Sequence, residues 1–527
     1  MQKELTLLLS PSEAANETIV KEFAASSLGY PTKSITGYQI RKRSIDARKK
    51  QPMVRLELNL FINEPFHERE IQTIALQEVS NAPKAVLIIG AGPAGLFAAL
   101  RLLENGIKPI ILERGRDVRS RRRDLAKLNK EGIVNPDSNY CFGEGGAGTY
   151  SDGKLYTRSK KRGDLDRVLN IFVHFGASEN ILYEAHPHIG TNKLPLIITA
   201  MREKIQEAGG IFLFDKKVVD LIIEKEKVGS VKTSDGQTFK ADAVILATGH
   251  SARDIFNMMN EKKLQVFFKP FAIGVRVEHP QALIDTIQYH CSPRIAHLPP
   301  ASYSLVEQVE GRGVFSFCMC PGGIIAPAAT AAGEVVVNGW SPSKRNNPYA
   351  NSGIVVQVEE KDIADHRKKY GELAGMHFQT KVEQRAFDFG GGKLAAPAQR
   401  LVDFTKKKLS TDLPDCSYLP GINSAPLNEV LPAFVYKALA SGFKEFGKKM
   451  KGYYSNDAVI LATESRTSSP VRIPRETNSL HHPQVKNLYP CGEGAGYAGG
   501  IISAAMDGER VASQIVEVLV GGQNTDS

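Results

Sequence analysis

The sequence of 527 residues predicts an α/β protein, on three observations. An apolar strand at 85–89 runs into a glycine-rich turn and an apolar helix. Strand and helix patterns alternate as far as residue 247, and a last strand, glycine-rich turn and helix follow from residue 487. Such alternation is typical of a parallel sheet covered by helices. At roughly 100 to 200 residues per domain, the chain has room for about three folding units.

Composition and charge narrow the class of protein. Apolar residues make up 42% of the chain and charged residues 24%, which predicts a soluble globular protein. Six irregularly spaced cysteines, no signal peptide and no uninterrupted apolar span favour a cytoplasmic location. The net charge of +10 favours anionic ligands, but the first 82 residues carry 11 basic and 10 acidic side chains. This near neutrality counts against nucleic-acid binding by that segment.

A small N-terminal domain is predicted over residues 1–82. Its expected elements are strands at 3–9, 34–43 and 53–61 and helices at 12–25 and 67–78. This βαββα order is typical of a two-layer α+β domain. Pro83 precedes the next apolar strand, so we expect the joint between domains there.

The turn after the strand at 85–89 predicts a dinucleotide site. It carries the G-x-G-x-x-G pattern, in which Gly90 permits a tight turn, Gly92 a close approach of the pyrophosphate, and Gly95 close packing of helix on strand. The helix that follows presents free N–H groups to the phosphates. Glu113 ends the next strand, where an acidic residue commonly binds ribose hydroxyls. The residues expected at this part of the site are Gly90, Gly92, Pro93, Ala94, Gly95, Glu113 and Arg114.

Three further segments favour FAD over NAD. A strand at 242–247 ends in Ala-Thr-Gly, a glycine-rich loop covers 143–154, and the strand from 487 leads into Gly492 and Glu493 before a helix from Ile501. In flavoproteins such a helix N-terminus stabilises negative charge on the reduced ring. We therefore expect one FAD per chain, bound without covalent attachment. The additional contacts expected are Gly145, Gly146, Gly148, Lys154, Thr248, Gly249, Gly492, Glu493, Gly499, Gly500 and Ile501.

Several longer segments resemble a known family. They are 44–49, the glycine pattern from Gly90, 139–155, 247–254, 317–323, 465–472 and the C-terminal glycine segment. Together they make the chain similar to the bacterial FAD-dependent dehydrogenases of uncharacterised substrate, within the group that shares the glutathione-reductase-type FAD domain. The resemblance implies an FAD-binding fold and oxidoreductase activity, but no established substrate and no catalytic residue.

The order of these segments predicts the division of the chain. We expect a Rossmann-like FAD-binding domain formed by residues 83–265 and 455–527, an inserted mixed α+β substrate domain at 266–454, and the small N-terminal α+β (βαββα) domain. The substrate should meet the flavin between the FAD-binding and substrate domains. Arg466 lies just before the return to the cofactor, where it would hold an anionic substrate or stabilise the reduced ring. This makes it the candidate catalytic residue, with a turn-forming role as the alternative.

Other side chains give weaker signals. Arg276 and Glu278 share one face of a strand and would pair on the surface. Cys318 and Cys320 would also share a face, either as buried thiols or as thiols lining a substrate pocket. No cysteine or histidine spacing matches a metal site, so neither zinc nor a structural disulfide is expected.

Three functions remain open from the sequence. The leading one is transfer of a hydride between an organic substrate and FAD. Because no second G-x-G-x-x-G occurs, no dedicated NAD(P)H domain is expected, and the electron acceptor is open. The alternatives are an FAD-dependent RNA-modifying protein, which the neutral N-terminal segment disfavours, and a protein that binds FAD only structurally. The oligomeric state is also open.

Overall fold

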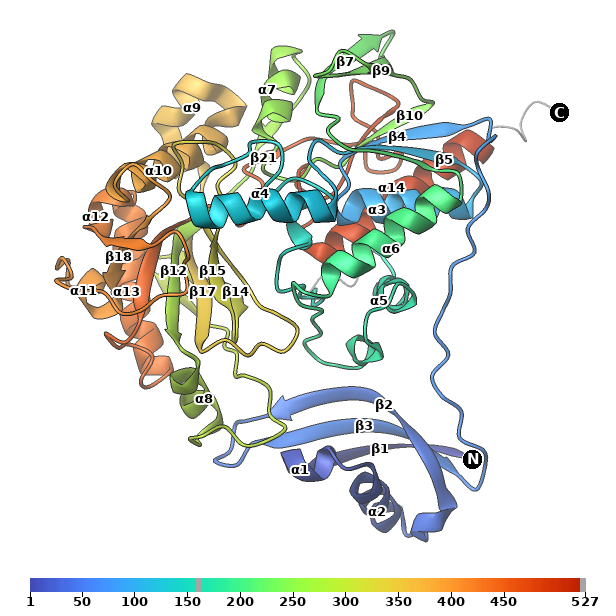
Figure 1. Ribbon diagram of the computed structural model, residues 1–527, viewed down its shortest axis with the longest axis vertical. Coiled ribbons are helices and arrows are strands. Elements are labelled where there is room, and N and C mark those ends of the chain that lie inside the picture. Colours follow the sequence, from blue (N-terminus) through green and yellow to red (C-terminus); the bar gives the residue numbers. More distant parts are fainter. Residues whose placement is uncertain (158–162, 522–527) are drawn as a thin grey trace.

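The computed structural model describes residues 1–157 and 163–521. The part formed by residues 83–265 and 465–521, in which the sequence predicts the cofactor site, is here called the cofactor half, and a parallel sheet forms its centre (Figure 1). Its strands, in spatial order, are β22 (Leu488–Pro490), β10 (Ala243–Leu246), β4 (Ala85–Ile89), β5 (Lys108–Leu112) and β6 (Ile211–Leu213). All neighbouring strands run parallel. Three helices pack beside the sheet, α3 (Pro93–Glu104), α6 (Leu194–Glu207) and α14 (Ile501–Gly521). The predicted α/β Rossmann-type fold is thereby confirmed for this half.

The connections of this half carry smaller elements. An antiparallel sheet consists of β7 (Val218–Glu224), β8 (Lys227–Thr233) and β9 (Thr238–Phe239). The other helices of these connections are α4 (Val118–Glu131), α5 (Leu165–His174) and α7 (Arg253–Glu261). The strands β11 (Phe267–Phe268) and β21 (Val471–Arg472) form an antiparallel pair. In sequence, β11 comes just before the strands of the second large sheet and β21 just after them.

The second large sheet has seven strands. In spatial order they are β13 (Val306–Val309), β14 (Arg312–Cys320), β17 (Tyr349–Val358), β12 (Phe271–Pro280), β20 (Val459–Glu464), β18 (Ala396–Arg400) and β19 (Ile422–Ser424). The pairs are antiparallel except β18 with β19. The short pair β15 (Ile324–Pro327) and β16 (Val337–Trp340) lies beside it. The helices of this second half of the molecule are α8 (Gln281–Tyr289), α9 (Ala364–Tyr370), α10 (Ala374–Phe389), α11 (Leu401–Thr405), α12 (Leu427–Val430) and α13 (Ala433–Lys449).

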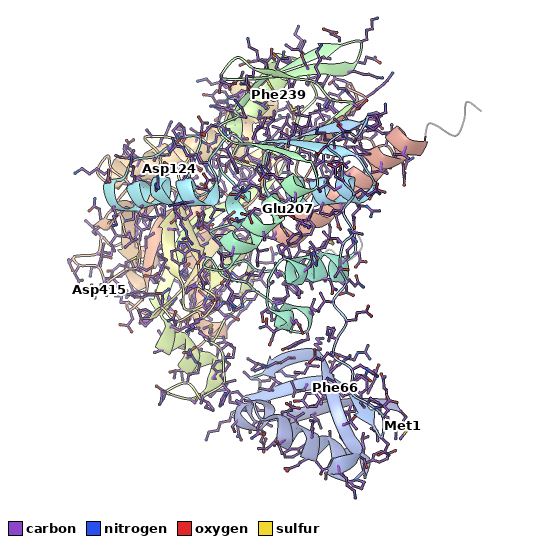
Figure 2. All side chains as sticks on the ribbon, turned by 45° about the vertical axis from the view of Figure 1, so that its right-hand side comes forward. Met1, Phe66, Asp124, Glu207, Phe239 and Asp415 are labelled. Atoms are coloured by element: carbon purple, nitrogen blue, oxygen red, sulfur yellow. The ribbon has the colours of Figure 1, made fainter. Side chains whose placement is uncertain are left out.

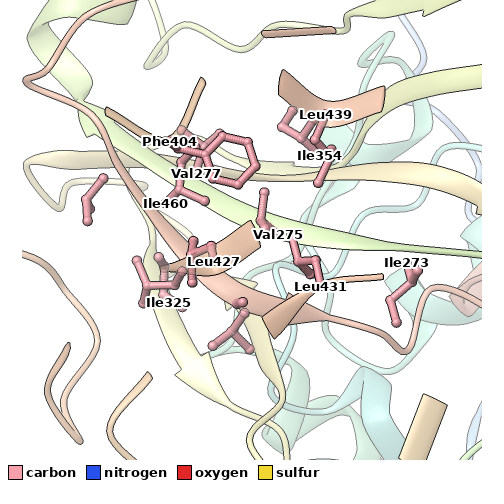
Figure 3. Packing of buried hydrophobic residues seen from close by; sticks show 14 of the residues in the cluster. Ile273, Val275, Val277, Ile325, Ile354, Phe404, Leu427, Leu431, Leu439 and Ile460 are labelled. Carbon is pink, nitrogen blue, oxygen red and sulfur yellow. The ribbon is translucent and has the colours of Figure 1, made fainter. Parts of the chain in front are cut away.

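Apolar side chains of strand β12 anchor the core of this second half. Ile273, Val275 and Val277 are fully buried. Figure 3 shows them among side chains from neighbouring elements, including Leu439 of α13 and Ile460 of β20. Burial of such side chains contributes roughly 1.5–3 kcal/mol each, so this core fixes the sheet that faces the cofactor half.

The inserted domain was predicted to end at residue 454, but strand β20 lies beyond that residue and still belongs to the inserted sheet. The strand pairs with β12 on one side and β18 on the other, in the middle of the seven-stranded sheet. Its Val-Ile-Leu-Ala run is buried on both faces, a pattern that also fits a strand of the parallel sheet. The inserted sheet therefore extends to Glu464, ten residues beyond the expected boundary.

The N-terminal sheet has the strand order β1–β3–β2, with β1 (Gln2–Leu9), β2 (Ile35–Asp46) and β3 (Met53–Ile62), and all pairs are antiparallel. Helices α1 (Pro11–Ala14) and α2 (Glu17–Leu28) supply buried side chains to its core. The helix predicted at 67–78 is wrong, because this segment has no regular secondary structure. Phe66, labelled in Figure 2, packs edge-on against Phe61 at 5.3 Å between ring centroids.

The segment after Phe66 is held by the cofactor half instead of forming a helix. The Gln72 N–H donates to Asn170 Oδ1 (3.1 Å), the Gln77 N–H to the Leu103 carbonyl (3.1 Å), and the Val79 N–H to the Ala208 carbonyl (2.9 Å). The backbone N–H groups of Gln72, Gln77 and Val79 thus find partners far away in sequence, which helical periodicity does not reveal.

The edge strand β2 also docks on the cofactor half. The Arg43 N–H donates to the Tyr183 carbonyl (2.8 Å), and the Ala185 N–H donates to the Arg43 carbonyl (2.9 Å). These two bonds cover part of an exposed sheet edge.

A shortened chain that begins near Ala82 should still bind FAD. The residues that line the cofactor cavity begin at Ile89, so the N-terminal domain supplies none of them. Flavin content of the purified, folded fragment checks this. A folded but colourless fragment would mean that the N-terminal domain contributes to the site.

None of the helices in residues 1–157 and 163–521 combines the length and the apolar character needed to span a membrane.

Candidate functional site

A single continuous cavity runs from the carboxyl ends of the parallel strands to the seven-stranded sheet. It encloses about 1820 Å³ of space between atoms, its open mouth included. One end is lined by the glycine-rich segments of the cofactor half. The other, here called the sheet end, is lined by Phe317, Cys318, Cys320, Asn338, Gly339, Arg466 and Thr467. Ligands of open α/β sheets bind outside the carboxyl ends of the strands, which is where this cavity begins.

The glycines along the cavity leave room for a ligand. A Cβ atom on Gly92 would meet nothing closer than the Gly146 Cα at 4.0 Å, and one on Gly249, Gly499 or Gly500 would meet nothing within 4 Å. Gly92 is also the N-cap of α3, so free N–H groups of the first helical turn face this space. The residues present therefore fit a cofactor with a pyrophosphate.

Two other predicted glycines, Gly90 and Gly95, shape the turn itself. A Cβ on Gly95 would lie 2.0 Å from the Gly90 carbonyl oxygen, so only glycine lets α3 approach the strand. Gly90 itself has a φ of +107°, a conformation that favours glycine.

Glu113 joins three loops of the cofactor end. Its Oε2 accepts the Ala91 N–H (2.9 Å), and its Oε1 accepts the N–H groups of Gly115 and Gly143 (both 2.9 Å). The side chain is only 4% exposed and lines the cavity. Because Oε1 already has two donors, Oε2 is the atom with room for a ribose hydroxyl.

The far part of the cofactor end carries paired cations. Arg114 donates to Asp137 (2.6 Å) and Asp254 (3.0 Å), and its guanidinium lies 4.2 Å from the ring centroid of Phe142. Lys217 approaches the same two carboxylates, at 3.3 and 3.6 Å. The two positive charges of Arg114 and Lys217 are therefore matched by the two negative charges of Asp137 and Asp254.

The C-terminal glycine segment depends on an aspartate that sequence reasoning missed. Asp507 of α14 accepts the Gly492 N–H through Oδ2 (2.8 Å) and pairs with Arg475 through Oδ1 (2.6 Å). Nearby, His250 Nδ1 lies 3.1 Å from Glu493 Oε2. An acid in the middle of a helix carries no motif, so only its backbone partner reveals its role.

Lys154, expected at the cofactor, lies where the two halves meet. Its Nζ is 3.7 Å from Cys320 Sγ of β14 and 3.4 Å from Asp152 Oδ2. Arg345 holds the same aspartate with two hydrogen bonds, from Nη2 to Oδ2 (2.7 Å) and from Nε to Oδ1 (3.2 Å). The aspartate side chain is 4% exposed, whereas that of Lys154 is 35% exposed. The Lys154 side chain is thus partly open to the cavity at the sheet end.

Arg466 belongs to a buried quartet of two guanidiniums and two carboxylates. Arg466 donates from Nε and Nη2 to Glu383 (3.1 and 3.0 Å), from Nη2 to Glu334 (3.1 Å), and from Nη1 to Thr330 Oγ1 (2.6 Å). Arg253 donates to the same two carboxylates, at 2.8 and 2.7 Å. Burial alone would raise the pKa of Glu383, but Arg253 and Arg466 lower it to about 2. Although Arg466 lines the cavity, these contacts engage most of its donors and favour a structural role.

The expected surface pair of Arg276 and Glu278 is not formed. Arg276 is fully buried and donates to Glu464 (2.7 Å) and to Asn351 Oδ1 (2.7 Å) behind the sheet end. Glu278 instead accepts the Ser417 N–H (2.8 Å). Each side chain found a partner on another strand or loop, which spacing along one strand cannot predict.

The two thiols do not share a face either. The pairing of β14 with β17 is irregular between Phe317 and Cys320, and Cys318 has a φ of +45°. As a result Cys318 is exposed and Cys320 is buried. Both line the cavity, which favours the pocket alternative over a purely structural one.

Most residues predicted for the cofactor come together. Those that line the cavity are Gly90, Gly92, Pro93, Ala94, Glu113, Arg114, Gly146, Gly148, Lys154, Thr248, Gly249, Glu493, Gly499, Gly500 and Ile501. Gly95, Gly145 and Gly492 lie outside the lining and support it from behind.

We expect metal analysis of the purified protein to give substoichiometric zinc. No group of three His, Cys, Asp or Glu side chains in the described part of the chain is arranged to hold a metal ion. All six cysteines are unpaired. One zinc per chain, or a mass two protons lower than that of the reduced chain, would contradict the expectation.

Three segments of the sequence match described domain families. Residues 84–273 match "Pyridine nucleotide-disulphide oxidoreductase", residues 270–467 match "FAD-dependent protein, C-terminal domain-like", and residues 1–61 match a domain of unknown function. The FAD-dependent description and the fitting cavity identify FAD as the cofactor.

Two relatives differ greatly in how much they share. An uncharacterized protein of Clostridium beijerinckii is 40% identical over 517 residues, covering 95% of this chain and 96% of that protein. A thiamine thiazole synthase of Aeropyrum pernix is 26% identical over 182 residues, covering 32% of this chain and 55% of that protein.

Solved structures show weaker likeness. A 2,6-dihydroxypyridine-3-hydroxylase from Arthrobacter nicotinovorans has 12% identity and a TM-score of 0.36, covering 84% of this chain and 85% of its own. A geranylgeranyl bacteriochlorophyll reductase-like protein from Thermoplasma acidophilum also has 12% identity and a TM-score of 0.36, covering 84% and 80%. Likeness at this level does not indicate a shared activity.

Proposed function

Because the chain belongs to a family of FAD-dependent oxidoreductases that includes the Clostridium beijerinckii protein, we propose that it transfers a hydride between an organic substrate and FAD. One observation carries the proposal. The cavity that holds the cofactor segments continues without a break to exposed side chains of the seven-stranded sheet and of the adjoining β16, such as Cys318 and Asn338. A site that binds FAD only for structure has no need of such an opening.

The residues divide between the two ends of the cavity. Gly92, Glu113 and the N-terminus of α3 would hold the pyrophosphate and adenosine part. Gly499, Gly500 and the N-terminus of α14 would face the ring system, with a positive potential that stabilises negative charge. Bound FAD supplies the two-electron chemistry, and the protein supplies binding, orientation and electrostatics.

The sheet end would receive the substrate. Phe317 offers an apolar wall, and Asn338 and Lys154 offer hydrogen-bond donors. The buried quartet around Arg466 keeps the wall of this end in place through its ion pairs with Glu334 and Glu383. On this proposal the quartet positions the site and does not itself contact the substrate.

Anaerobic reduction of the holoprotein tests the proposal. Candidate organic donors and both nicotinamide nucleotides are added one by one, and loss of the visible flavin absorption is followed. A donor that bleaches protein-bound FAD much faster than free FAD supports an oxidoreductase. A flavin that resists every donor, yet is bleached by dithionite, supports a structural cofactor instead.

A further inference from the structure

We propose that the substrate carries a carboxylate and that Lys154 binds it at the sheet end of the cavity. The inference rests on the proposed function, since it names the class of substrate that the same cavity takes. It assigns Lys154 to the substrate, where the glycine-loop pattern alone had assigned it to the cofactor.

The charges along the cavity single out Lys154. Arg114 and Lys217 share two carboxylates, Lys216 pairs with Asp235, and Arg466 shares two carboxylates with Arg253. The first two groups carry as many negative as positive charges. In the quartet, burial and the neighbouring Glu383 raise the pKa of Glu334 to about 7, but both guanidiniums are bound to the two carboxyl groups. The cofactor end therefore leaves no net positive charge, and the guanidiniums of the quartet are engaged with their own buried partners.

At Lys154 the balance differs. Lys154 and Arg345 share one carboxylate, Asp152, and no other carboxylate of the described residues lies within 4.0 Å of either cation. Arg345 makes the shorter contacts and takes both oxygens. One positive charge therefore remains, and it lies on the more exposed side chain of the two.

The ammonium group stays charged in this position. Desolvation by burial, the largest influence, would lower its pKa, but Coulombic attraction to Cys320 and Asp152 raises the pKa of Lys154 above the usual value. Cys320 contributes to this only when its thiol is ionised, so Asp152 is the permanent negative charge beside the ammonium group. The neighbouring His188 donates from Nε2 to the Ser343 carbonyl (3.1 Å), and burial together with Arg345 lowers its pKa, so it adds no charge at neutral pH. A cation that no second carboxylate compensates, on a side chain partly open to a cavity, attracts an anion strongly.

A second donor favours a carboxylate over a monatomic anion. Asn338 is exposed and lines the same end, and its Oδ1 already accepts from Arg276 (3.3 Å) and from the Gly339 N–H (2.7 Å). Among the described residues its Nδ2 group has no partner, so it remains available as a donor. Phe317 and the thiol of Cys318 provide the apolar surface for the body of such an acid.

The position of Lys154 is fixed from both halves. The Leu155 N–H donates to the Pro187 carbonyl (2.9 Å), and the Gly190 N–H donates to the Asp152 carbonyl (3.0 Å). On the other side Arg345 clamps the Asp152 carboxylate. The lysine is therefore held at the junction where substrate and ring would meet.

Carboxylate and amide pairs of the same shape test the inference. Benzoate and hexanoate are titrated against the holoprotein, beside benzamide and hexanamide, and binding is followed through the change in flavin absorption. We expect at least one carboxylate to bind roughly tenfold or more tightly than its amide, because a charge-assisted contact contributes about 1.5–3 kcal/mol.

Three variants locate the effect. Lys154→Met should weaken carboxylate binding by about tenfold to hundredfold and leave amide binding unchanged, whereas Lys154→Arg should retain most of the affinity. Lys232→Met removes an exposed lysine of β8 outside the cavity and should change nothing. If Lys154→Met loses FAD, the test uses the native protein and Lys154→Arg alone. A preference of both proteins for the carboxylate over its amide supports the inference, and no preference in either contradicts it.

Two results would overturn the inference. One is a native holoprotein that prefers neither carboxylate to its amide. The other is a Lys154→Met protein with native carboxylate affinity and a lowered flavin reduction potential, which would place the lysine at the ring. Either result leaves the proposed oxidoreductase function standing if a donor still bleaches the flavin. Carboxylate binding without reduction by any donor would instead contradict the function alone.

Discussion

Replacement of Gly92 by valine should yield a folded protein without FAD. The backbone at Gly92 has a φ of −75°, which valine can adopt, and an added Cβ would meet nothing closer than 4.0 Å. The methyl groups would therefore extend into the cavity at the N-terminus of α3, where the pyrophosphate is expected. Loss of charge-assisted hydrogen bonds there, each contributing about 1.5–3 kcal/mol, would weaken FAD binding roughly a hundredfold or more.

Gly229→Val provides the matched control. Gly229 is exposed on β8 outside the cavity, and a Cβ there would have only an ordinary contact, 3.5 Å from Glu224 Oε2. This variant should purify with native flavin content. Circular dichroism of both proteins separates lost cofactor from lost fold. A Gly92→Val protein that keeps its flavin would show that the pyrophosphate lies elsewhere.

Local patterns predicted the cofactor half well. The strand at 85–89, the glycine turn and α3 follow each other directly, so apolar periodicity and glycine spacing were sufficient. The helix expected at 67–78 failed for the opposite reason. Gln72 and Gln77 of this segment, and Val79 just after it, donate backbone hydrogen bonds to Asn170, Leu103 and Ala208, which no local pattern reveals.

The sheet end of the site was much less predictable. Strand β20 has the same buried apolar run as a parallel strand, and only its pairing with β12 and β18 places it in the other sheet. The partners of Arg466 come from residues 330, 334 and 383, on two separate segments. Contacts of this kind depend on the tertiary fold, so a single sequence identifies the charged residue but not its role.

Glu383→Gln should destabilise the protein by about 3–5 kcal/mol, the usual effect of removing one partner from a buried ion pair. Glu383 is fully buried and accepts hydrogen bonds from Arg466, Arg253 and Ser465 Oγ (2.5 Å). Glutamine keeps the shape but leaves two guanidiniums with one carboxylate. The Arg466 side chain is only 5% exposed and that of Arg253 18%, so the desolvation of the remaining charge is largely uncompensated.

The measurement that tests this role of the quartet is denaturant unfolding of the holoprotein with excess FAD. Glu360→Gln is the control, because Glu360 pairs with Arg367 on the surface and should contribute less than about 1 kcal/mol. Adding Arg466→Met to Glu383→Gln should restore part of the lost stability, since the two side chains are coupled. If Glu383→Gln unfolds like the native protein while Arg466→Ala slows flavin reduction by the donor, Arg466 serves the substrate directly and the quartet does not stabilise the wall of the cavity.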